Sequence, residues 1–251
     1  MKAIILAAGM GSRLGEITKN KPKGMIKLFG KTLLERQIEI YKNCGISDIT
    51  IVTGYKSEKI NFLDVNKIKN ENFSTTNINE SLFCASEKLS NSVIVSYTDI
   101  IFEEKIIRQI LNFSGDIGIC INLNWEKNYD GRSLHPLSEA ENVLIKNEKI
   151  TKIKKNLLQE SPNEKIGEFL GIMKLSKNGG DILLKKYSNL KKHHVGSFHT
   201  ANSFQQAYLT DMLQEIIDSG IDISPIVVDG NWCEIDTVED LEKVKSSSMF
   251  I

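Results

Sequence analysis

The chain has 251 residues, of which 41% are hydrophobic and 25% are charged, and its formal net charge is zero. This length is enough to bury a sizeable core, and the neutral balance argues against a nucleic-acid partner, which usually needs a basic excess. No apolar run approaches the length of a membrane-spanning helix and no N-terminal targeting signal is visible, so we expect no membrane anchor and a cytoplasmic location. The four cysteines are scattered without a CxxC pair, which indicates reduced thiols.

The first 28 residues contain the densest set of motifs. The apolar run 3–8 predicts a buried strand, which ends in the glycine-rich turn Gly9-Met10-Gly11-Ser12 followed by Arg13. A second basic point, Lys21-Pro22-Lys23, lies further along. Glycines allow a turn to bring its backbone N–H groups close to an anion, and Arg and Lys add positive charge. The stretch therefore predicts a polyphosphate site.

The next segments predict a helix and a second strand. Thr32 and Glu35 match a capping box, apolar residues then repeat at helical spacing, and Gly45 is a plausible C-terminal stop. The run 48–53 reads as a strand. Strand, helix and strand in this order are typical of a parallel α/β sheet, whose ligands bind at the carboxyl ends of the strands.

The remaining elements continue this α/β pattern. We expect helices over 80–89, 103–113, 180–187, 203–218 and 238–245, strands over 92–97, 116–122, 166–175 and 225–228, and a hairpin over 142–153. The irregular stretch 123–141 is aromatic and charged, which favours an acceptor-side loop. Since no repeat or linker separates these parts, we predict a single domain over 1–251. It comprises a nucleotide-binding half (1–120), an acceptor or lid subregion (121–202), and closing helices with a second metal motif (203–245).

Two familiar phosphate motifs are absent from the sequence. The opening turn lacks the third glycine of a dinucleotide fingerprint, and no P-loop pattern occurs anywhere. The combination of LAAGMGSRLG with TKNKPKGM instead resembles the nucleotidyltransferases that activate sugar phosphates and small phosphate esters. The resemblance covers most of the chain and is strongest over 1–55, around Asp99 and at WCEIDTVEDL. It implies a three-layer α/β/α, Rossmann-like fold with a mostly parallel mixed sheet. It also implies attack of an acceptor phosphate oxygen on the α-phosphorus of a nucleoside triphosphate, with loss of pyrophosphate.

The resemblance implies three catalytic residues: Arg13 holds the β- and γ-phosphates, Lys23 bridges the reacting phosphates, and Asp99 holds a metal with Asp236. The residue types agree with these roles. Each aspartate ends a strand-like segment, where a bare carboxylate is costly unless it meets a cation, and two carboxylates with phosphate oxygens suit Mg²⁺. The alternative role for each aspartate is a helix N-cap, and both roles can coexist. Thr98 stands where the family motif has glycine.

The resemblance also implies the binding residues. For the nucleotide these are Leu6, Ala7, Ala8, Gly9, Gly11, Ser12, Arg13, Thr53, Gly54, Glu80 and Ser81. The segment 77–81 matches the N-x-x-S-L position of cytidylyltransferases for phosphocholine and aminoethylphosphonate, although helix capping is an equal alternative there. An amine-bearing acceptor favours carboxylates and aromatic faces. The acceptor candidates are Asp130, Arg132, Lys154, Glu168 and Trp232, and Lys154 is alternatively a solvated pair with Lys155.

These patterns favour an Mg²⁺-dependent cytidylyltransferase that transfers CMP from CTP to a small phosphate or phosphonate monoester. The branch that it most resembles acts on phosphocholine, 2-aminoethylphosphonate and phosphoglutamine-type precursors. Two alternatives stay open: a sugar-1-phosphate nucleotidyltransferase that uses UTP, dTTP or GTP, and a catalytically silent, nucleotide-binding regulatory homologue. We expect no nucleic-acid or membrane partner, and we leave the oligomeric state open, with a homodimer as one option.

Overall fold

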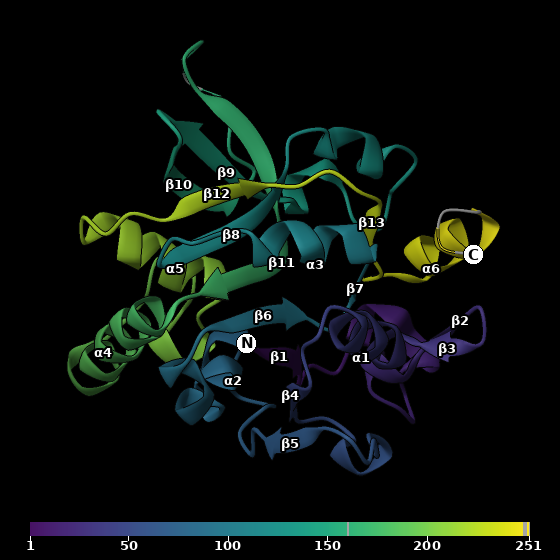
Figure 1. Cartoon of the computed structure of the whole chain (residues 1–251). Coiled ribbons are helices and arrows are strands. Elements are labelled where there is room, and N and C mark those ends of the chain that lie inside the picture. Colours follow the sequence, from purple (N-terminus) through teal and green to yellow (C-terminus); the bar gives the residue numbers. More distant parts are fainter. Residues whose placement is uncertain (160, 248–249, 251) are drawn as a thin grey trace.

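A nine-stranded mixed sheet forms the centre of the computed structural model, which describes residues 1–159, 161–247 and 250 (Figure 1). The strand order is β10-β9-β11-β6-β1-β4-β5, with β8 also paired to β11 and β12 paired to β8. In the N-terminal half, β4 and β6 run parallel to β1, and β5 runs parallel to β4. The strands are β1 (Lys2–Ala7), β4 (Asp48–Thr53), β5 (Asn66–Lys69), β6 (Val93–Tyr97), β8 (Ile117–Asn122), β9 (Glu141–Lys146), β10 (Lys149–Lys155), β11 (Lys165–Leu175) and β12 (Ser224–Val227).

Two small antiparallel sheets flank the large one. They pair β2 (Lys27–Leu28) with β3 (Lys31–Thr32), and β7 (Ile100–Phe102) with β13 (Trp232–Glu234). The second pair matters for the site, because it brings together two segments that lie far apart in the sequence.

Helices cover both faces of the large sheet, which confirms the predicted α/β class. Along β1, Ile4 and Leu6 pack into one core, and Ala3, Ile5 and Ala7 pack into the other. The first core includes α2 (Ile78–Cys84), α4 (Lys177–His193) and α5 (Leu209–Asp218); the second includes α1 (Leu33–Asn43) and α3 (Glu104–Leu111). This alternation is the two-residue period of a strand buried on both faces. A further helix, α6 (Val238–Ser246), packs with the turn after β1 in a third, smaller core.

Strand β11 changes partner halfway along one of its edges. Residues 165–168 pair with β9, whereas residues 172–175 pair with β6. The register with β8 on the other edge also shifts between Phe169 and Met173. The sheet therefore separates between β9 and β6, and the middle of β11 faces the opening.

Most predicted elements are confirmed, but several boundaries differ. The predicted helix 80–89 is divided into α2 and a 3₁₀ turn over Ser86–Ser90, and the predicted helix 203–218 begins only at Leu209. Helix α4 begins at Lys177, where Ser176 caps it, and it extends to His193, so it is longer at both ends than the predicted helix 180–187. It contains Gly180, where a Cβ atom would lie 1.9 Å from the Leu89 carbonyl oxygen. The glycine is therefore needed inside this helix for close packing. From the sequence pattern alone, such a glycine looks the same as one at a helix end.

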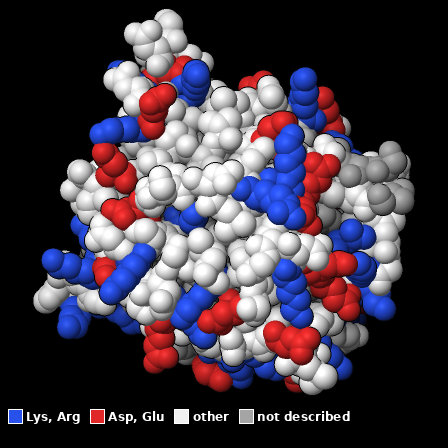
Figure 2. Space-filling model, in the orientation of Figure 1, with Lys and Arg blue, Asp and Glu red and all other residues white. Residues whose placement is uncertain are grey.

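The surface carries both signs of charge. Figure 2 shows Lys and Arg side chains interspersed with Asp and Glu over the face that it presents, in line with the zero net charge. Within the described part of the chain, no helix combines the length and hydrophobicity that a membrane crossing requires.

Candidate active site

The glycine-rich turn and the second basic point meet at the carboxyl end of the parallel strands. Strand β1 ends at Ala7, and a 3₁₀ segment begins at Ser12. Lys23 opens a short 3₁₀ turn directly before Gly24. A Cβ atom on Gly24 would lie 2.6 Å from Thr98 Oγ1, so only glycine allows this close approach to the end of β6. The approach places Lys23 beside Asp99.

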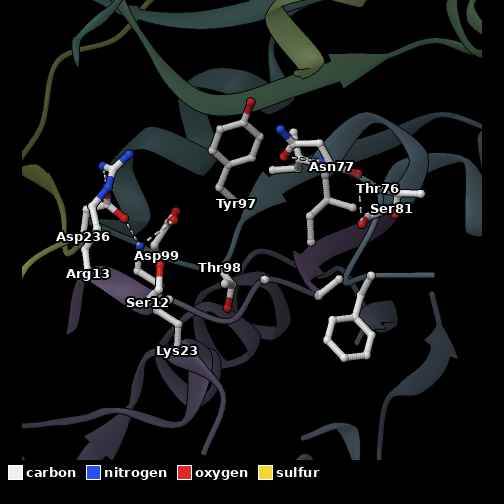
Figure 3. A pocket seen from close by; sticks show the side chains of 16 residues that line it. Ser12, Arg13, Lys23, Thr76, Asn77, Ser81, Tyr97, Thr98, Asp99 and Asp236 are labelled. Atoms are coloured by element: carbon white, nitrogen blue, oxygen red, sulfur yellow. Dashed lines mark hydrogen bonds and ion pairs between the residues drawn. The ribbon is translucent and has the colours of Figure 1, made fainter. Parts of the chain in front are cut away.

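The two predicted metal ligands are brought together by the pairing of β7 with β13. Asp99 directly precedes β7, Asp236 follows β13, and the Ile235 N–H donates to the Asp99 carbonyl oxygen at 2.8 Å. Lys23 Nζ lies 2.9 Å from Asp99 Oδ2 and 2.5 Å from Asp236 Oδ1. Arg13 donates to Asp236 Oδ2 from the other side (Figure 3). Four predicted residues thus form one cluster.

Opposite charges in this cluster stabilise one another's ionised forms. Burial by itself lowers the pKa of Lys23, but the attraction of Asp99, Asp236 and Glu234 outweighs it, so the pKa lies above its ordinary value. Burial raises the pKa of Asp236, yet Lys23 and Arg13 reverse this and hold it below its usual range. Burial, followed by the repulsion of Asp99 and Asp236, raises the pKa of Glu234 well above normal. The cluster therefore keeps a lysine cation against an ionised aspartate.

The donor set fits a divalent cation. Asp99 Oδ1 is buried and has no hydrogen-bond partner among the described residues, which is costly unless a cation or donor meets it. His135, Glu234 and Asp236 each offer a ligand atom, and these atoms lie within 4.8 Å of one another. Burial and the nearby Arg132 lower the pKa of His135 to about 4, so its imidazole is neutral at pH 7 and can coordinate. Carboxylate oxygens are the ligands that Mg²⁺ prefers.

A cavity of about 270 Å³ lies against the glycine turn. Figure 3 shows Ser12, Arg13, Lys23, Asp99 and Asp236 on one side of it, Thr76, Asn77 and Ser81 on the other, and Tyr97 between them. Leu6, Ala8, Gly9 and Gly11 also line it. Most of the predicted nucleotide residues are thus gathered around one hollow. Phe73, Thr76 and Tyr97 were not predicted. Asn77 belongs to the segment 77–81, for which a nucleotide site and helix capping were equal alternatives; it caps α2 and also lines the cavity.

Four predicted nucleotide residues do not line this cavity. Ala7 is buried in one of the two cores of the sheet. Thr53 is fully buried, and its hydroxyl lies 2.8 Å from Ser57 Oγ. Gly54 packs against the Ala8 carbonyl oxygen, to which a Cβ atom would approach within 2.6 Å. Glu80 accepts a hydrogen bond from Tyr187 Oη at 2.7 Å and pairs with Lys191, so it is engaged by α4. Their predicted contacts with nucleotide remain untested.

A second cavity, of about 260 Å³, adjoins the first where β11 leaves β9. Both cavities are lined by Arg13, Asn77, Tyr97, Asp99 and Asp236. The second adds aromatic and charged side chains from distant segments: Tyr129, His135, Glu139, Glu141, Lys155, Glu168, Tyr208, Trp232 and Glu234. Its position next to the charged cluster suits a second substrate.

Two of the five predicted acceptor residues, Glu168 and Trp232, line this second cavity, and the structure places the other three elsewhere. Arg132 lies behind it, with Nε 2.7 Å from Asp240 Oδ1. Asp130 is exposed, and its backbone carbonyl accepts from Lys243 at 2.8 Å. Lys154 is exposed on β10, whereas its neighbour Lys155 faces the cavity. Adjacent residues of a strand point to opposite faces, so an error of one position exchanges the two.

Comparison with known proteins agrees with this geometry. Residues 3–159 match the MobA-like NTP transferase domain. A CTP:phosphoglutamine cytidylyltransferase from Campylobacter jejuni is 30% identical over 96% of this chain and 98% of its own length. A choline-phosphate cytidylyltransferase from Streptococcus pneumoniae is 39% identical over 41% of this chain and 47% of its own. A solved CTP:phosphocholine cytidylyltransferase from Streptococcus pneumoniae superimposes with a TM-score of 0.73, at 25% identity and over 97% of both chains. The chain belongs to the MobA-like NTP transferase family and is a nucleotidyltransferase.

Proposed function

We propose that the chain is an Mg²⁺-dependent cytidylyltransferase that transfers CMP from CTP to a small phosphate or phosphonate monoester. The observation that carries the proposal is the pair of adjoining cavities that share Arg13, Asp99 and Asp236, with Lys23 lining the first of them. One lies on the glycine turn and suits a nucleotide, and the other is rich in carboxylates and aromatic rings. The cytidylyltransferase relatives, one matching nearly the whole chain, support CTP as the donor.

In the proposed reaction an acceptor phosphate oxygen forms a bond to the α-phosphorus of CTP. The bond from that phosphorus to the oxygen bridging the α- and β-phosphates breaks, and pyrophosphate leaves with the electron pair. Such chemistry depends on positioning and on neutralising charge. Lys23 reduces the repulsion between the two reacting anions, and Arg13, which is half-exposed at the cavity, holds the leaving pyrophosphate.

Asp99 and Asp236 would hold the divalent cation, with His135 and Glu234 close enough to contribute. A bound Mg²⁺ would neutralise phosphate charge and orient the triphosphate. Lys23 lies between the two aspartates in the structure, so it must give up one of these contacts as the cation and phosphates enter. The freed ammonium group can then reach the reacting phosphates.

A pyrophosphate-release assay tests the proposal. CTP, UTP, dTTP and GTP are each combined with phosphocholine, 2-aminoethylphosphonate, phosphoglutamine and hexose 1-phosphates, with and without Mg²⁺. We expect turnover with CTP and a non-sugar phosphate or phosphonate, and its loss on chelation. Turnover only with a hexose 1-phosphate would overturn the proposed acceptor class, and CTP binding without turnover of any acceptor would indicate a regulatory homologue.

A further inference from the structure

Two buried polar side chains face the second cavity from different strands. Glu168 lies in β11, where its residue pairs with both β8 and β9, and Trp232 begins β13. Glu168 is 4% exposed and Trp232 is 6% exposed, yet both line the cavity. Buried polar groups in proteins are nearly always hydrogen-bonded, so each needs a partner.

Their hydrogen bonds are incomplete. Tyr129 Oη donates to Glu168 Oε1, which orients the carboxyl group. The other oxygen, Oε2, and the indole nitrogen of Trp232 have no hydrogen-bond partner within the described part of the chain. One of these atoms calls for a donor and the other, an N–H, calls for an acceptor. A ligand that satisfies both must carry both kinds of group.

The charges around the cavity point the same way. Glu139, Glu141 and Glu168 supply carboxyl groups, and Lys155 supplies a half-buried ammonium group 2.6 Å from Glu139. Glu141 accepts two long hydrogen bonds, from Tyr97 Oη at 3.4 Å and Thr210 Oγ1 at 3.3 Å. The cavity is therefore lined by more carboxyl groups, which can bind a cation, than by ammonium groups, and Lys155 can bind an anion.

We propose that the acceptor's far end is a primary ammonium group beside a carboxylate, as in an amino acid, rather than a quaternary ammonium group. The ammonium N–H groups donate to Glu168 Oε2, and the carboxylate accepts from Trp232 Nε1, in a cavity that Lys155 also lines. This inference rests on the proposed function and narrows its substrate class.

The physical basis is the cost of unsatisfied buried groups. A trimethylammonium group carries charge but no N–H donor, and it offers nothing for the indole N–H. A site built to hydrogen-bond a ligand rejects an analogue that lacks the matching group much more strongly than an apolar pocket rejects a missing methyl. Discrimination therefore comes from hydrogen bonding and not from charge alone.

The ionisation of Glu168 gives the proposal a second signature. Burial raises the pKa of Glu168 to about 8, a rise that the hydrogen bond from Tyr129 and the charge of Arg132 reduce and the charge of Glu141 increases. At pH 7 the free side chain is therefore mostly protonated. An ammonium ion favours the carboxylate form, so its binding lowers this pKa and releases a proton.

Four acceptors separate the contributions when each is assayed with CTP and Mg²⁺. They are 2-amino-4-phosphonobutyrate, 3-aminopropylphosphonate, which lacks the carboxylate, 4-phosphonobutyrate, which lacks the ammonium, and phosphocholine, which has a quaternary nitrogen. The first three phosphonates are also assayed as homologues that are one methylene group longer, which tests whether the cavity takes a longer acceptor. We expect the amino acid to exceed each of the others by about tenfold or more in kcat/KM.

Substitutions assign the effect to the two side chains. The preference is measured as the ratio of kcat/KM for two acceptors. Glu168→Gln should reduce the ratio of 2-amino-4-phosphonobutyrate to 4-phosphonobutyrate by about tenfold. Trp232→Phe should reduce the ratio of 2-amino-4-phosphonobutyrate to 3-aminopropylphosphonate by about fivefold. Glu148→Gln, on the exposed turn between β9 and β10, is the matched control. Calorimetry of the wild type at pH 7, in buffers of different ionisation heat, should show release of about one proton with the amino acid and not with 4-phosphonobutyrate. Glu168→Gln should abolish this release.

The outcomes separate this inference from the proposed function. Turnover of phosphocholine equal to or above that of the ammonium-bearing phosphonates would overturn the inference and leave cytidylyl transfer intact. Equal proton release with and without the ammonium would also overturn it. Failure of CTP with every acceptor would instead overturn the proposed function.

Discussion

The proposed nucleotide side and the proposed acceptor side of the site are built in different ways. On the nucleotide side, six of the eight residues in the short stretch 6–13 line a single cavity, to which Lys23, Asp99 and the segment 73–81 also contribute. On the acceptor side, the cavity draws its lining from several strands, among them β9, β10, β11 and β13, and from scattered positions of the irregular stretch 123–141. A site made of consecutive residues leaves a readable motif, whereas a site assembled from isolated residues does not.

The acceptor side also depends on a helix at the far end of the chain. Glu239 of α6 accepts from the backbone N–H groups of Ser133 and Leu134, at 2.7 and 2.9 Å, and from the Ser133 hydroxyl. Lys243 donates to the backbone carbonyls of Asn128 and Asp130. These contacts hold the stretch that carries Tyr129 and His135 into the cavity. The comparison therefore predicts that substitutions on the two sides affect different kinetic constants.

The largest effect should follow Asp99→Ala. Removing this carboxylate leaves Lys23 and any bound cation with one aspartate fewer, so turnover should fall by about 10³-fold or more while the fold survives. Pyrophosphate release measures the loss, and circular dichroism checks the fold. Asp64→Ala, at a side chain that is 79% exposed, is the control. Near-normal turnover of a folded Asp99→Ala protein would remove Asp99 from the site.

Lys23→Ala should reduce kcat by about 10²-fold, because the ammonium group matters most when charge develops between the reacting phosphates. CTP binding, measured by calorimetry, should weaken much less than kcat falls. Lys21→Ala, in the same loop, is the matched control and should stay near the wild type. An equal loss in both variants would show that general loop charge, and not the position of Lys23, is responsible.

Glu239→Ala should raise the acceptor KM by about tenfold and leave the CTP KM unchanged, because it loosens the stretch around Ser133 without touching the glycine turn. Initial rates with each substrate varied in turn give both constants. Glu242→Ala is the control, since Glu242 lies on the same helix and pairs with Lys245. A parallel rise in both KM values would mean that α6 supports the fold as a whole.

Lys155→Ala should raise the acceptor KM by about fivefold, whereas Lys154→Ala should change it by less than about twofold. The reason is the alternation of β10, which turns Lys155 into the cavity and Lys154 outward. The same kinetic assay compares the two lysines directly. The reverse order would restore the sequence-based choice of Lys154.

The smallest effect on activity should follow Glu80→Ala. Its carboxylate is engaged by Tyr187 and Lys191 of α4, so the CTP KM should change by less than about twofold. The lost contact between α2 and α4 should instead lower the melting temperature. A large rise in the CTP KM with an unchanged melting temperature would return Glu80 to the nucleotide site.

The sequence by itself determined the fold class and the four residues of the charged cluster that we propose to be catalytic. Its strand–helix–strand order and buried runs predicted the α/β sheet, and the capping box of Thr32 and Glu35 forms as expected. Arg13, Lys23, Asp99 and Asp236 were predicted individually, and the structure brings them into contact. Such features are readable because strand ends and helix caps depend on residues close together in the chain.

Only the tertiary structure decided the proposed acceptor cavity and the residues that line it. The strand β11 changes partner from β9 to β6, and no local pattern signals that change. The alternation of side chains along β10 turns Lys155, and not Lys154, into the cavity. Arg132 pairs with Asp240 of α6 and does not line the cavity. The unpaired atoms of Glu168 and Trp232 likewise become visible only when the packing shows which neighbours they have. Burial, the face of the sheet to which a strand residue points, and contacts between residues far apart in the sequence are properties of the folded chain.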